Sequence, residues 1–438
     1  MSDYIYILES HLSPDQNLVL GEVMAAAGQA NLNLFLTGGA MRDMLAGFRI
    51  RDLDFVVEGA ALKLAKAVAA HSGAAIVSAD ENRKSAELLF RSGATAQIAM
   101  SRQEKYPRGG GKPQVSPATI QEDLRGRDFT CNAVALSLNK TSRGLLLDPL
   151  NGLADIERHE LRAVSAYGFY DDPTRLLRLV RLGVRLGFAT EERTAMQVAN
   201  AREAQVEKSI PPHALGAELK LVGAEDNAAG IIDALAQAGL LGLFSAALAE
   251  NHPHRAGLAK FEKIARMLPD ELPVRAARFG PFMVALTEKL SSREKQALAK
   301  HLELSRADTN HWLQLEARSK KLAAALRSPR IRKPSQVYQI VSTAAPDQVM
   351  FLLYASALKP VQDRLRAYFQ KYLPAVQEIT PEEWATVEAK PSRQQKAREE
   401  FIANRLDRRA PRKPPPAPPP PVPEPVMARP RAVGQVRA

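Results

Sequence analysis

The chain contains 438 residues, of which 45% are hydrophobic and 25% are charged, and its formal net charge at pH 7 is +12. This length is sufficient for two or three domains with hydrophobic cores of their own. The single cysteine, Cys131, excludes an internal disulfide, and no apolar run approaches the ~18–20 residues of a membrane-spanning helix. We therefore predict a cytoplasmic protein without a membrane partner, whereas the sequence does not determine its oligomeric state.

The first informative element is a predicted strand at 34–37 that runs into Gly38 and Gly39, with Arg42 shortly afterwards. Paired glycines after an apolar run predict a turn at which the backbone closely approaches another group. The backbone N–H groups of such a turn, together with a guanidinium, are suited to binding phosphate.

A second predicted strand, 51–57, carries two aspartates, Asp52 and Asp54. Because side chains alternate along a strand, we expect both carboxylates on one face and Leu53 and Phe55 on the other. Adjacent carboxylates repel each other unless a cation lies between them, and their oxygens suit Mg²⁺. Alone, an Asp-x-Asp pair is more often a solvated strand edge. Together with the Gly-Gly turn, it predicts a metal-dependent nucleotidyl transfer site.

Residues 94–106 predict a further strand, which carries Gln97, and residues 104–119 predict a mobile loop near the site. The loop contains a Gly-Gly-Gly-Lys run that ends at Lys112. It is not a P-loop, because the first glycine of that motif is missing and Pro113 stands where Ser or Thr would bind Mg²⁺.

Three further blocks follow in order at 122–133, 147–155 and 169–181. With the Gly-Gly-x-x-Arg-Asp and Asp-x-Asp motifs, they resemble the bacterial tRNA nucleotidyltransferase and poly(A) polymerase family of class II, over about residues 30–240. The resemblance implies a template-independent enzyme that adds C and/or A from CTP or ATP to the 3′ end of tRNA or another RNA. It also implies two-metal phosphoryl transfer with release of pyrophosphate.

The family's residue roles carry over by position. Asp52 and Asp54 would be the catalytic residues and would hold two Mg²⁺ ions. The resemblance implies nine nucleotide-binding residues, which come from several of these motifs: Gly38, Gly39, Arg42, Arg127, Asp128, Asn132, Asp172, Arg175 and Arg178. The two glycines and Arg42 would bind the triphosphate, and the Arg127 block would read the ribose 2′-hydroxyl.

The 169–181 block would select the base. Asp172 and Arg175 match the pair that hydrogen-bonds the base edge of CTP or ATP, and Arg178 matches a further triphosphate contact. Three positions apart at a predicted helix start, Asp172 and Arg175 would be neighbours on one face. Arg185, later in the same arginine row, is expected to face solvent or RNA phosphate; a solvated amphipathic face is the alternative for the whole row.

The sequence departs from the family pattern at three positions, of which one is mild: Asp171 replaces the more usual glutamate at the start of the base-reading block. Gln97 stands where a third acidic residue is usual, and it can ligate a metal but contributes no charge. Gly126 replaces the first of two arginines before Asp128. A catalytically weakened, RNA-binding homologue is therefore an alternative, as is a poly(A) polymerase. The retained Asp-x-Asp pair favours an enzyme, but the sequence does not separate CCA, CC-only, A-only and poly(A) addition.

We predict an α+β fold in four segments. Residues 1–155 would form a small mixed-sheet, palm-like nucleotidyltransferase head. An all-α region would follow, with a neck at 156–240 for base selection and RNA binding, and a body and tail at 241–375 for RNA binding. Residues 376–438 would form a basic, Pro-rich, disordered and flexible tail.

The positive charge is concentrated near the C-terminus. Residues 390–438 contain twelve Lys/Arg and four Asp/Glu and so carry +8, which leaves only +4 for residues 1–389. Eleven prolines from Pro411 to Pro430 oppose a regular helix and predict an extended arm. Such an arm could speed association with RNA, keep the protein soluble, or bind another protein, and the sequence leaves these alternatives open.

Overall fold

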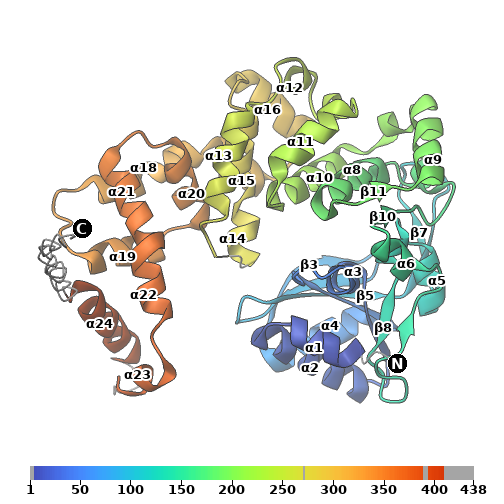
Figure 1. Cartoon of the computed structure of the whole chain (residues 1–438), viewed down its shortest axis with the longest axis horizontal. Helices are drawn as coiled ribbons and strands as arrows, with labels where there is room; N and C mark the ends of the chain where they lie inside the picture. The colour runs from blue at the N-terminus through green and yellow to red at the C-terminus, as the bar shows by residue number, and fades with distance from the viewer. Residues whose placement is uncertain (1–3, 270–271, 388–392, 409–438) are drawn as a thin grey trace, which may run out of the picture.

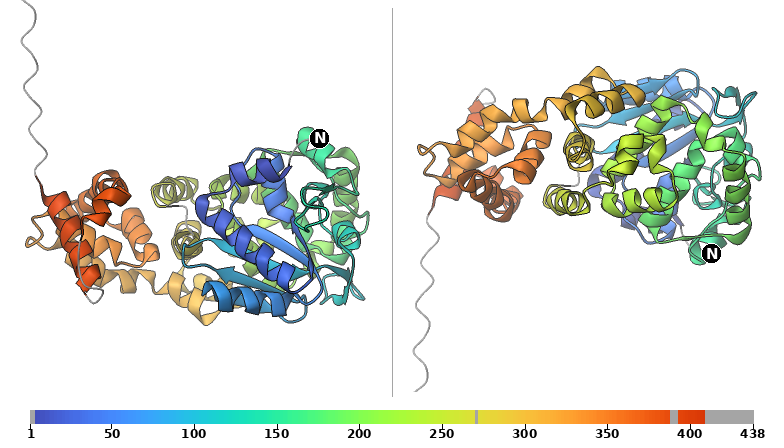
Figure 2. Two further views of the ribbon diagram at one scale, coloured as in Figure 1. Left: turned by 90° about the horizontal axis from the view of Figure 1, so that it is seen from below. Right: turned by 90° about the horizontal axis from the view of Figure 1, so that it is seen from above.

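The computed structural model describes residues 4–269, 272–387 and 393–408. Strands occur only up to residue 190 of this part, and the remainder is helical (Figures 1 and 2). The predicted combination of a mixed-sheet head and a mostly helical remainder is thus confirmed. The segment predicted as an all-α neck is a correction in one respect, because it contains two short paired strands at 160–161 and 189–190. No described helix is long and apolar enough to cross a membrane.

A seven-stranded sheet forms the centre of the head, in the order β3-β4-β5-β2-β1-β8-β9. Its strands are β1 (Asn33–Thr37), β2 (Leu53–Glu58), β3 (Ala75–Asp80), β4 (Ser85–Leu89), β5 (Thr95–Met100), β8 (Ala135–Ser137) and β9 (Leu146–Leu147). β2 and β5 are parallel, and the other neighbouring pairs are antiparallel, so the sheet is mixed. The strands predicted at 34–37 and 51–57 correspond to β1 and β2.

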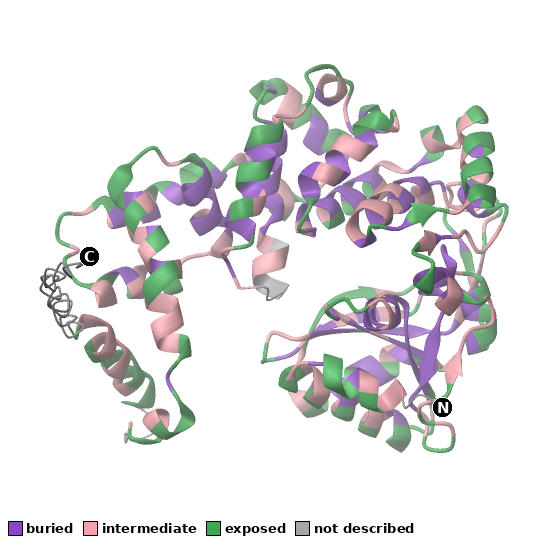
Figure 3. Cartoon of the chain, in the orientation of Figure 1, coloured by how far each residue is buried: buried purple, intermediate pink, exposed green. Residues whose placement is uncertain are grey.

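The two faces of the sheet pack into different cores. Leu53 and Phe55 lie in one core, while Val56 and Phe35 lie in the other. The alternation predicted for β2 is therefore confirmed, and Asp54 lies on the side of Val56. Burial of a side chain such as Phe55 stabilises the fold by roughly 1.5–3 kcal/mol. Figure 3 shows the central strands of the sheet as buried, whereas the edge strand β3 is largely exposed.

Short helices surround the sheet and continue into the neck. In the head they are α1 (Tyr4–His11), α2 (Pro14–Gln29), α3 (Gly38–Leu45), α4 (Ala61–Ser72), α5 (Ile120–Arg125), η1 (Thr130–Asn132) and α6 (Gly152–Glu157). Next come β10 (Glu160–Leu161), α7 (Gly168–Asp171), α8 (Thr174–Leu186), β11 (Ala189–Thr190), α9 (Glu192–Glu203), η2 (Val206–Ser209), α10 (Pro212–Ala224) and α11 (Ala228–Gln237). α2 and α5 both begin with capping boxes, which satisfy backbone N–H groups of their first turns.

The prediction of a mobile loop at 104–119 is wrong for most of that segment. β6 (Arg102–Lys105) and β7 (Gln114–Pro117) pair as an antiparallel hairpin, so only residues 106–113 lie between strands. The carboxylate of Glu104 fixes the hairpin by accepting hydrogen bonds from three side chains: Arg83, Arg102 and Tyr106. Burial alone would raise the pKa of Glu104, but these bonds, led by that from Arg83, lower it to about 2. The glycines suggested an unstructured segment because they indicate turns but not pairing partners.

The connection between the two hairpin strands rests on the neck. The backbone N–H of Gly110 donates to the carbonyl of Asp171 at 3.1 Å. A β-carbon on Gly109 would lie only 2.5 Å from the carbonyl oxygen of Tyr170, so this close approach requires glycine.

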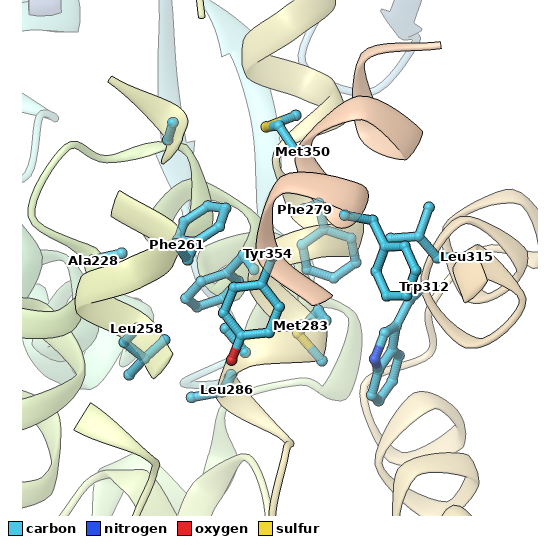
Figure 4. Close-up of a cluster of buried hydrophobic side chains, with 14 of the residues drawn as sticks. Ala228, Leu258, Phe261, Phe279, Met283, Leu286, Trp312, Leu315, Met350 and Tyr354 are labelled. Carbon is cyan, nitrogen blue, oxygen red and sulfur yellow. The ribbon is translucent and has the colours of Figure 1, made fainter. Parts of the chain in front are cut away.

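The helical body has one continuous core. It contains η3 (Leu241–Leu243), α12 (Ala246–Glu250), α13 (Arg255–Ala265), α14 (Leu272–Ala277), α15 (Phe279–Leu286), α16 (Ser292–His301), α17 (Arg306–Leu313), α18 (Leu315–Arg327), α19 (Pro334–Ser342), α20 (Pro346–Ala355), α21 (Lys359–Ala367) and η4 (Tyr368–Tyr372). Figure 4 shows the aromatic centre of this core, where Phe261, Phe279, Trp312 and Tyr354 pack with methionines and leucines.

Helical order continues past residue 376, where the sequence predicted the tail to begin. α22 (Leu373–Gln377) is followed by α23 (Pro381–Ala385) and α24 (Gln394–Asp407). The rings of Trp384 and Phe401 lie 5.7 Å apart, and Arg405 forms a 2.6 Å ion pair with Glu383. The prolines of α22 and α23 stand in the first helical turn, where the N–H that proline lacks has no intrahelical partner. The eleven prolines of the tail lie outside the described residues.

Candidate active site

Gly38 and Gly39 form the first turn of α3, directly after β1, and this Gly-Gly turn packs against Asp54. Gly38 has a φ of +64°, and the backbone N–H of Gly39 donates to Asp54 Oδ2 at 2.9 Å. A β-carbon on either glycine would lie 3.1 Å from that same oxygen. The glycines therefore permit both the left-handed backbone and the close approach, and the turn places backbone amides beside the carboxylate.

Asp52 and Asp54 form a pair of like charges at the start of β2. The hydroxyl of Thr95 donates to Asp52 Oδ1 at 2.7 Å, and the other oxygen, Oδ2, lies 3.5 Å from a nitrogen of Arg275. Burial and the neighbouring charge of Asp52 raise the pKa of Asp54 to about 6, although Arg127 and the bond from Gly39 partly oppose this. The negative charge of the pair is thus only partly compensated by neighbouring groups.

The position of Gln97 agrees with its predicted place in the site. β2 and β5 pair in parallel with Asp54 directly opposite Gln97, which is exposed. Two carboxylates and an amide carbonyl are hard oxygen donors, and a divalent cation would relieve the repulsion that raises the pKa of Asp54, so the residues fit such an ion. Among the described residues, no group of three or more His, Cys, Asp or Glu could hold a metal alone. Substrate oxygens would have to complete the coordination.

A chain of two hydrogen bonds and one ion pair links four predicted nucleotide-binding residues. Arg42 on α3 is buried and donates to Asn132 Oδ1 at 2.7 Å. Asn132 donates to Asp128 Oδ1 at 2.9 Å, and Arg178 on α8 lies 2.8 Å from Asp128 Oδ2. Burial would raise the pKa of Asp128, but Arg178 and Asn132 outweigh it and lower the pKa to about 2. The structure therefore brings these residues together.

Arg127 and its chain neighbour Asp128 contact different parts of the site. Its guanidinium pairs with Asp123 at 2.6 Å and donates to the Thr37 hydroxyl at 3.5 Å. Its Nη1 lies 3.7 Å from the place of a β-carbon on Gly38. Arg127 thus adjoins the Gly-Gly turn, whereas Asp128 faces the neck helix.

Asp172 and Arg175 lie together at the start of α8, as predicted. Asp172 Oδ1 accepts hydrogen bonds from the backbone N–H and the hydroxyl of Thr174, the first residue of α8. Arg175 donates to the backbone carbonyls of Gly126 and Arg127 at 3.1 and 3.2 Å. Its Nε is 4.0 Å from Asp172 Oδ2, is buried, and has no hydrogen-bond partner within the described part of the chain.

Arg185 does not face solvent or RNA, and that expectation is wrong. Its Nη2 lies 2.6 Å from the buried carboxylate of Asp43, and its Nε lies 3.7 Å from Glu225 Oε2. Burial, reinforced by the nearby charge of Arg42, lowers the pKa of Arg185. The arginine row is therefore continued into an internal ion-pair network, in which Arg51 also pairs with Glu225 at 2.7 Å.

Sequence reasoning missed several residues that contact the site. Thr95 carried a usable signal, because it lies two positions before Gln97 on the same strand and so shares its face. Glu225 and Arg275 carried none, since both lie far along the chain in helices without a recognisable motif.

Comparison with known proteins agrees with this geometry. Residues 34–162 match the family model described as "Poly A polymerase head domain". The chain is 27% identical over 344 residues to an A-adding tRNA nucleotidyltransferase of Aquifex aeolicus, covering 78% of this chain and 40% of the relative. It is 35% identical over 224 residues to an A-adding tRNA nucleotidyltransferase of Halalkalibacterium halodurans, covering 50% and 52%.

A third relative, the CC-adding tRNA nucleotidyltransferase of Deinococcus radiodurans, is 37% identical over 218 residues, covering 49% of this chain and 56% of the relative. The chain thus spans about half the length of these curated relatives. Among solved structures, apo form II of a CCA-adding enzyme is similar in fold, with a TM-score of 0.54 and 23% identity over 93% of this chain and 95% of that one. A CCA-adding enzyme in complex with CTP has a TM-score of 0.51 and 24% identity, with the same coverage.

Proposed function

We propose that this chain, whose residues 34–162 belong to the poly(A) polymerase head-domain family, is a template-independent nucleotidyltransferase acting on RNA 3′ ends. It would add C and/or A to tRNA from CTP or ATP, with release of pyrophosphate. One observation supports this most directly: the N–H of Gly39 lies 2.9 Å from Asp54 Oδ2, so a turn suited to phosphate adjoins a carboxylate pair suited to a cation.

Nucleotidyltransferases depend in general on divalent cations. We propose Mg²⁺ as the ion and Asp52 and Asp54 as the residues that hold it. When bound, it would supply activation of the primer 3′-hydroxyl and stabilisation of the leaving pyrophosphate. The protein's own part is to keep both carboxylates on one side of a rigid strand, with Asp54 held by Gly39 and Asp52 by Thr95.

The triphosphate would lie on the Gly-Gly turn. A triphosphate would share or displace bonds that are already made there: the N–H of Gly39 donates to Asp54, and the buried guanidinium of Arg42 donates to Asp43 and Asn132. Arg127 adjoins the same turn. Arg178 would add a cation from the neck helix. Asp128 and Asn132, which are hydrogen-bonded to each other, would read the ribose hydroxyl.

The base would be read by Asp172 and Arg175. The Thr174 bonds fix Asp172, and the two backbone carbonyls fix the fork of Arg175, so both side chains are preorganised before a nucleotide binds. A site built on such hydrogen bonds rejects a wrong base edge, because its buried polar groups would be left unpaired. The unpartnered Nε of Arg175 is one such group.

The RNA would contact the helical segments predicted as neck and body, 156–240 and 241–375. The names of the similar proteins include A-adding and CC-adding tRNA nucleotidyltransferases and CCA-adding enzymes, and one solved neighbour contains CTP. We extend tRNA and CTP to this chain as its proposed partners, and we propose a cytoplasmic location accordingly.

Incubation with labelled nucleotides tests the proposal. The full chain is mixed with Mg²⁺, labelled CTP or ATP, and tRNA transcripts that lack the last three, two or one nucleotides. We expect incorporation on at least one primer, and the pattern separates CCA, CC-only and A-only addition. Long products from ATP on an unrelated RNA would indicate a poly(A) polymerase. RNA binding without any incorporation would contradict the proposal and favour the weakened homologue suggested by Gln97 and Gly126.

A further inference from the structure

The carboxylate pair is in contact with a cation from the helical body. Arg275 on α14 places Nη1 3.5 Å from Asp52 Oδ2, across 223 positions of sequence. Its side chain is only 11% exposed, whereas that of Asp52 is 46% exposed. In Figure 1, α14 extends from the body towards the head. The guanidinium is therefore held at the site rather than in bulk water.

The positive groups next to Asp52 and those next to Asp54 come from different parts of the chain. Asp54 is compensated within the head, by Arg127 and the amide of Gly39. Asp52 receives a neutral hydrogen bond from Thr95, and its ionic partner is Arg275. The positive charge next to Asp52 therefore comes from the body, and it lies on a carboxylate oxygen that could otherwise ligate a divalent cation.

We propose that Arg275 competes with the divalent cation for Asp52 and so lowers the metal affinity of the nucleotide-free protein. This inference rests on the proposed function, because it takes Asp52 and Asp54 as metal ligands. A guanidinium and a divalent cation on one carboxylate repel each other, so a cation binds tightly only when Arg275 has withdrawn.

The incoming triphosphate is the partner that would draw Arg275 away. Guanidinium groups bind phosphate as readily as carboxylate, and the triphosphate would lie beside Asp54 on the Gly-Gly turn. A change of rotamer is sufficient to move the guanidinium, because the arginine side chain has several rotatable bonds. Metal and nucleotide would then bind with positive coupling, and the site would hold little metal until a substrate arrives.

Two binding measurements on the full chain test the proposal without any turnover. Mn²⁺ affinity is measured by electron paramagnetic resonance in the absence of nucleotide. Arg275→Gln is expected to raise Mn²⁺ affinity by about tenfold or more, since a divalent cation a few ångströms from a unit charge is repelled that strongly even in water. CTP affinity is measured by calorimetry in EDTA, and Arg275→Gln should lower it severalfold. These opposite shifts would not follow from a purely structural role.

Three further variants complete the test. Arg275→Lys keeps the charge and should stay within about twofold of the unaltered protein for Mn²⁺. Arg255→Gln removes an exposed body arginine, paired with Asp233 at 2.7 Å, and should change neither affinity. Asp54→Asn should lose Mn²⁺ binding. Unchanged Mn²⁺ affinity in Arg275→Gln, or equal gains in Arg275→Lys, would overturn the inference alone. Unchanged Mn²⁺ binding in Asp54→Asn would overturn both the inference and the proposed metal site.

Discussion

The guanidinium of Arg178 lies 2.8 Å from the buried carboxylate of Asp128, so an ion pair joins the neck helix α8 to the head. Because Arg178 and Asn132 more than offset the effect of burial, the pKa of Asp128 falls to about 2, and the group is ionised at neutral pH. The contact joins two predicted nucleotide-binding residues, and it also helps to hold the neck helix α8 against the head.

Asp128→Asn should therefore destabilise the protein by about 1–3 kcal/mol at pH 7, seen as a Tm lowered by a few degrees. The folded pKa of Asp128 is below its unfolded value, so its stabilising effect is present above about pH 4 and is lost as the pH falls towards 2. The Tm difference between Asp128→Asn and the unaltered protein should be constant from pH 8 to 5 and shrink below that. A difference that grows on acidification would contradict the assigned ion pair.

Asp172→Asn should relax the choice among CTP, ATP, UTP and GTP. Asparagine retains an oxygen that can accept the bonds from Thr174, so that contact is preserved, but an NH₂ donor replaces the second oxygen, which faces Arg175. The measurement is the incorporation ratio of the four nucleotides on one tRNA primer. Glu192→Gln, an exposed acidic residue on α9, is the control and should leave the ratio unchanged. An unaltered ratio in Asp172→Asn would mean that the base is read elsewhere.

Gln97→Asp should lower the Mg²⁺ concentration needed for half-maximal incorporation severalfold. It places a third negative charge opposite Asp54 in the paired strands. Gln97→Asn keeps the amide and serves as the matched control, with no gain in Mg²⁺ affinity. If the Mg²⁺ dependence of Gln97→Asp is unchanged, the charge at this position does not influence the metal.

Gly109→Ala should detach the 106–113 connection from the neck, because the new β-carbon would lie 2.5 Å from the Tyr170 carbonyl oxygen. Amide hydrogen exchange in this segment is expected to rise by about tenfold or more, while the sheet stays protected. Gly28→Ala on α2, where a β-carbon meets nothing within 4 Å, is the control and should leave exchange there unchanged. Equal protection in both variants would show that the segment is not docked as described.

Local patterns in the sequence were sufficient to predict the sheet of the head and the closeness of the Gly-Gly turn to Asp54. The period of two along β2 separated Leu53 and Phe55 from Asp54, because one face of that strand must be buried. The Gly-Gly turn was predictable from the glycines themselves, because glycine favours the positive φ of Gly38 and leaves room for the close approach of Asp54.

Long-range ion pairs were not predictable. Arg185 was expected at the surface, but its partner Asp43 lies 142 positions away, and neither residue type nor spacing indicates such a pair. The same is true of Arg275 and Asp52. The hairpin that contains Glu104 was not predicted, because the glycines and prolines of its connection indicated a loop. Helices α23 and α24 were not predicted, because the prolines that follow them indicated an extended tail.

The central claim is that Asp52 and Asp54 carry out nucleotidyl transfer. Its most direct test is single-turnover incorporation of labelled CTP or ATP into a tRNA primer by Asp54→Asn and Asp52→Asn, with Tm measured in EDTA. Because the pKa of Asp54 is raised to about 6, its charge disfavours the metal-free fold above that pH. We expect Asp54→Asn to keep or slightly raise the Tm at pH 7.5, and both variants to lose incorporation by a factor of about 10³ or more. Near-normal incorporation by either folded variant would contradict the account.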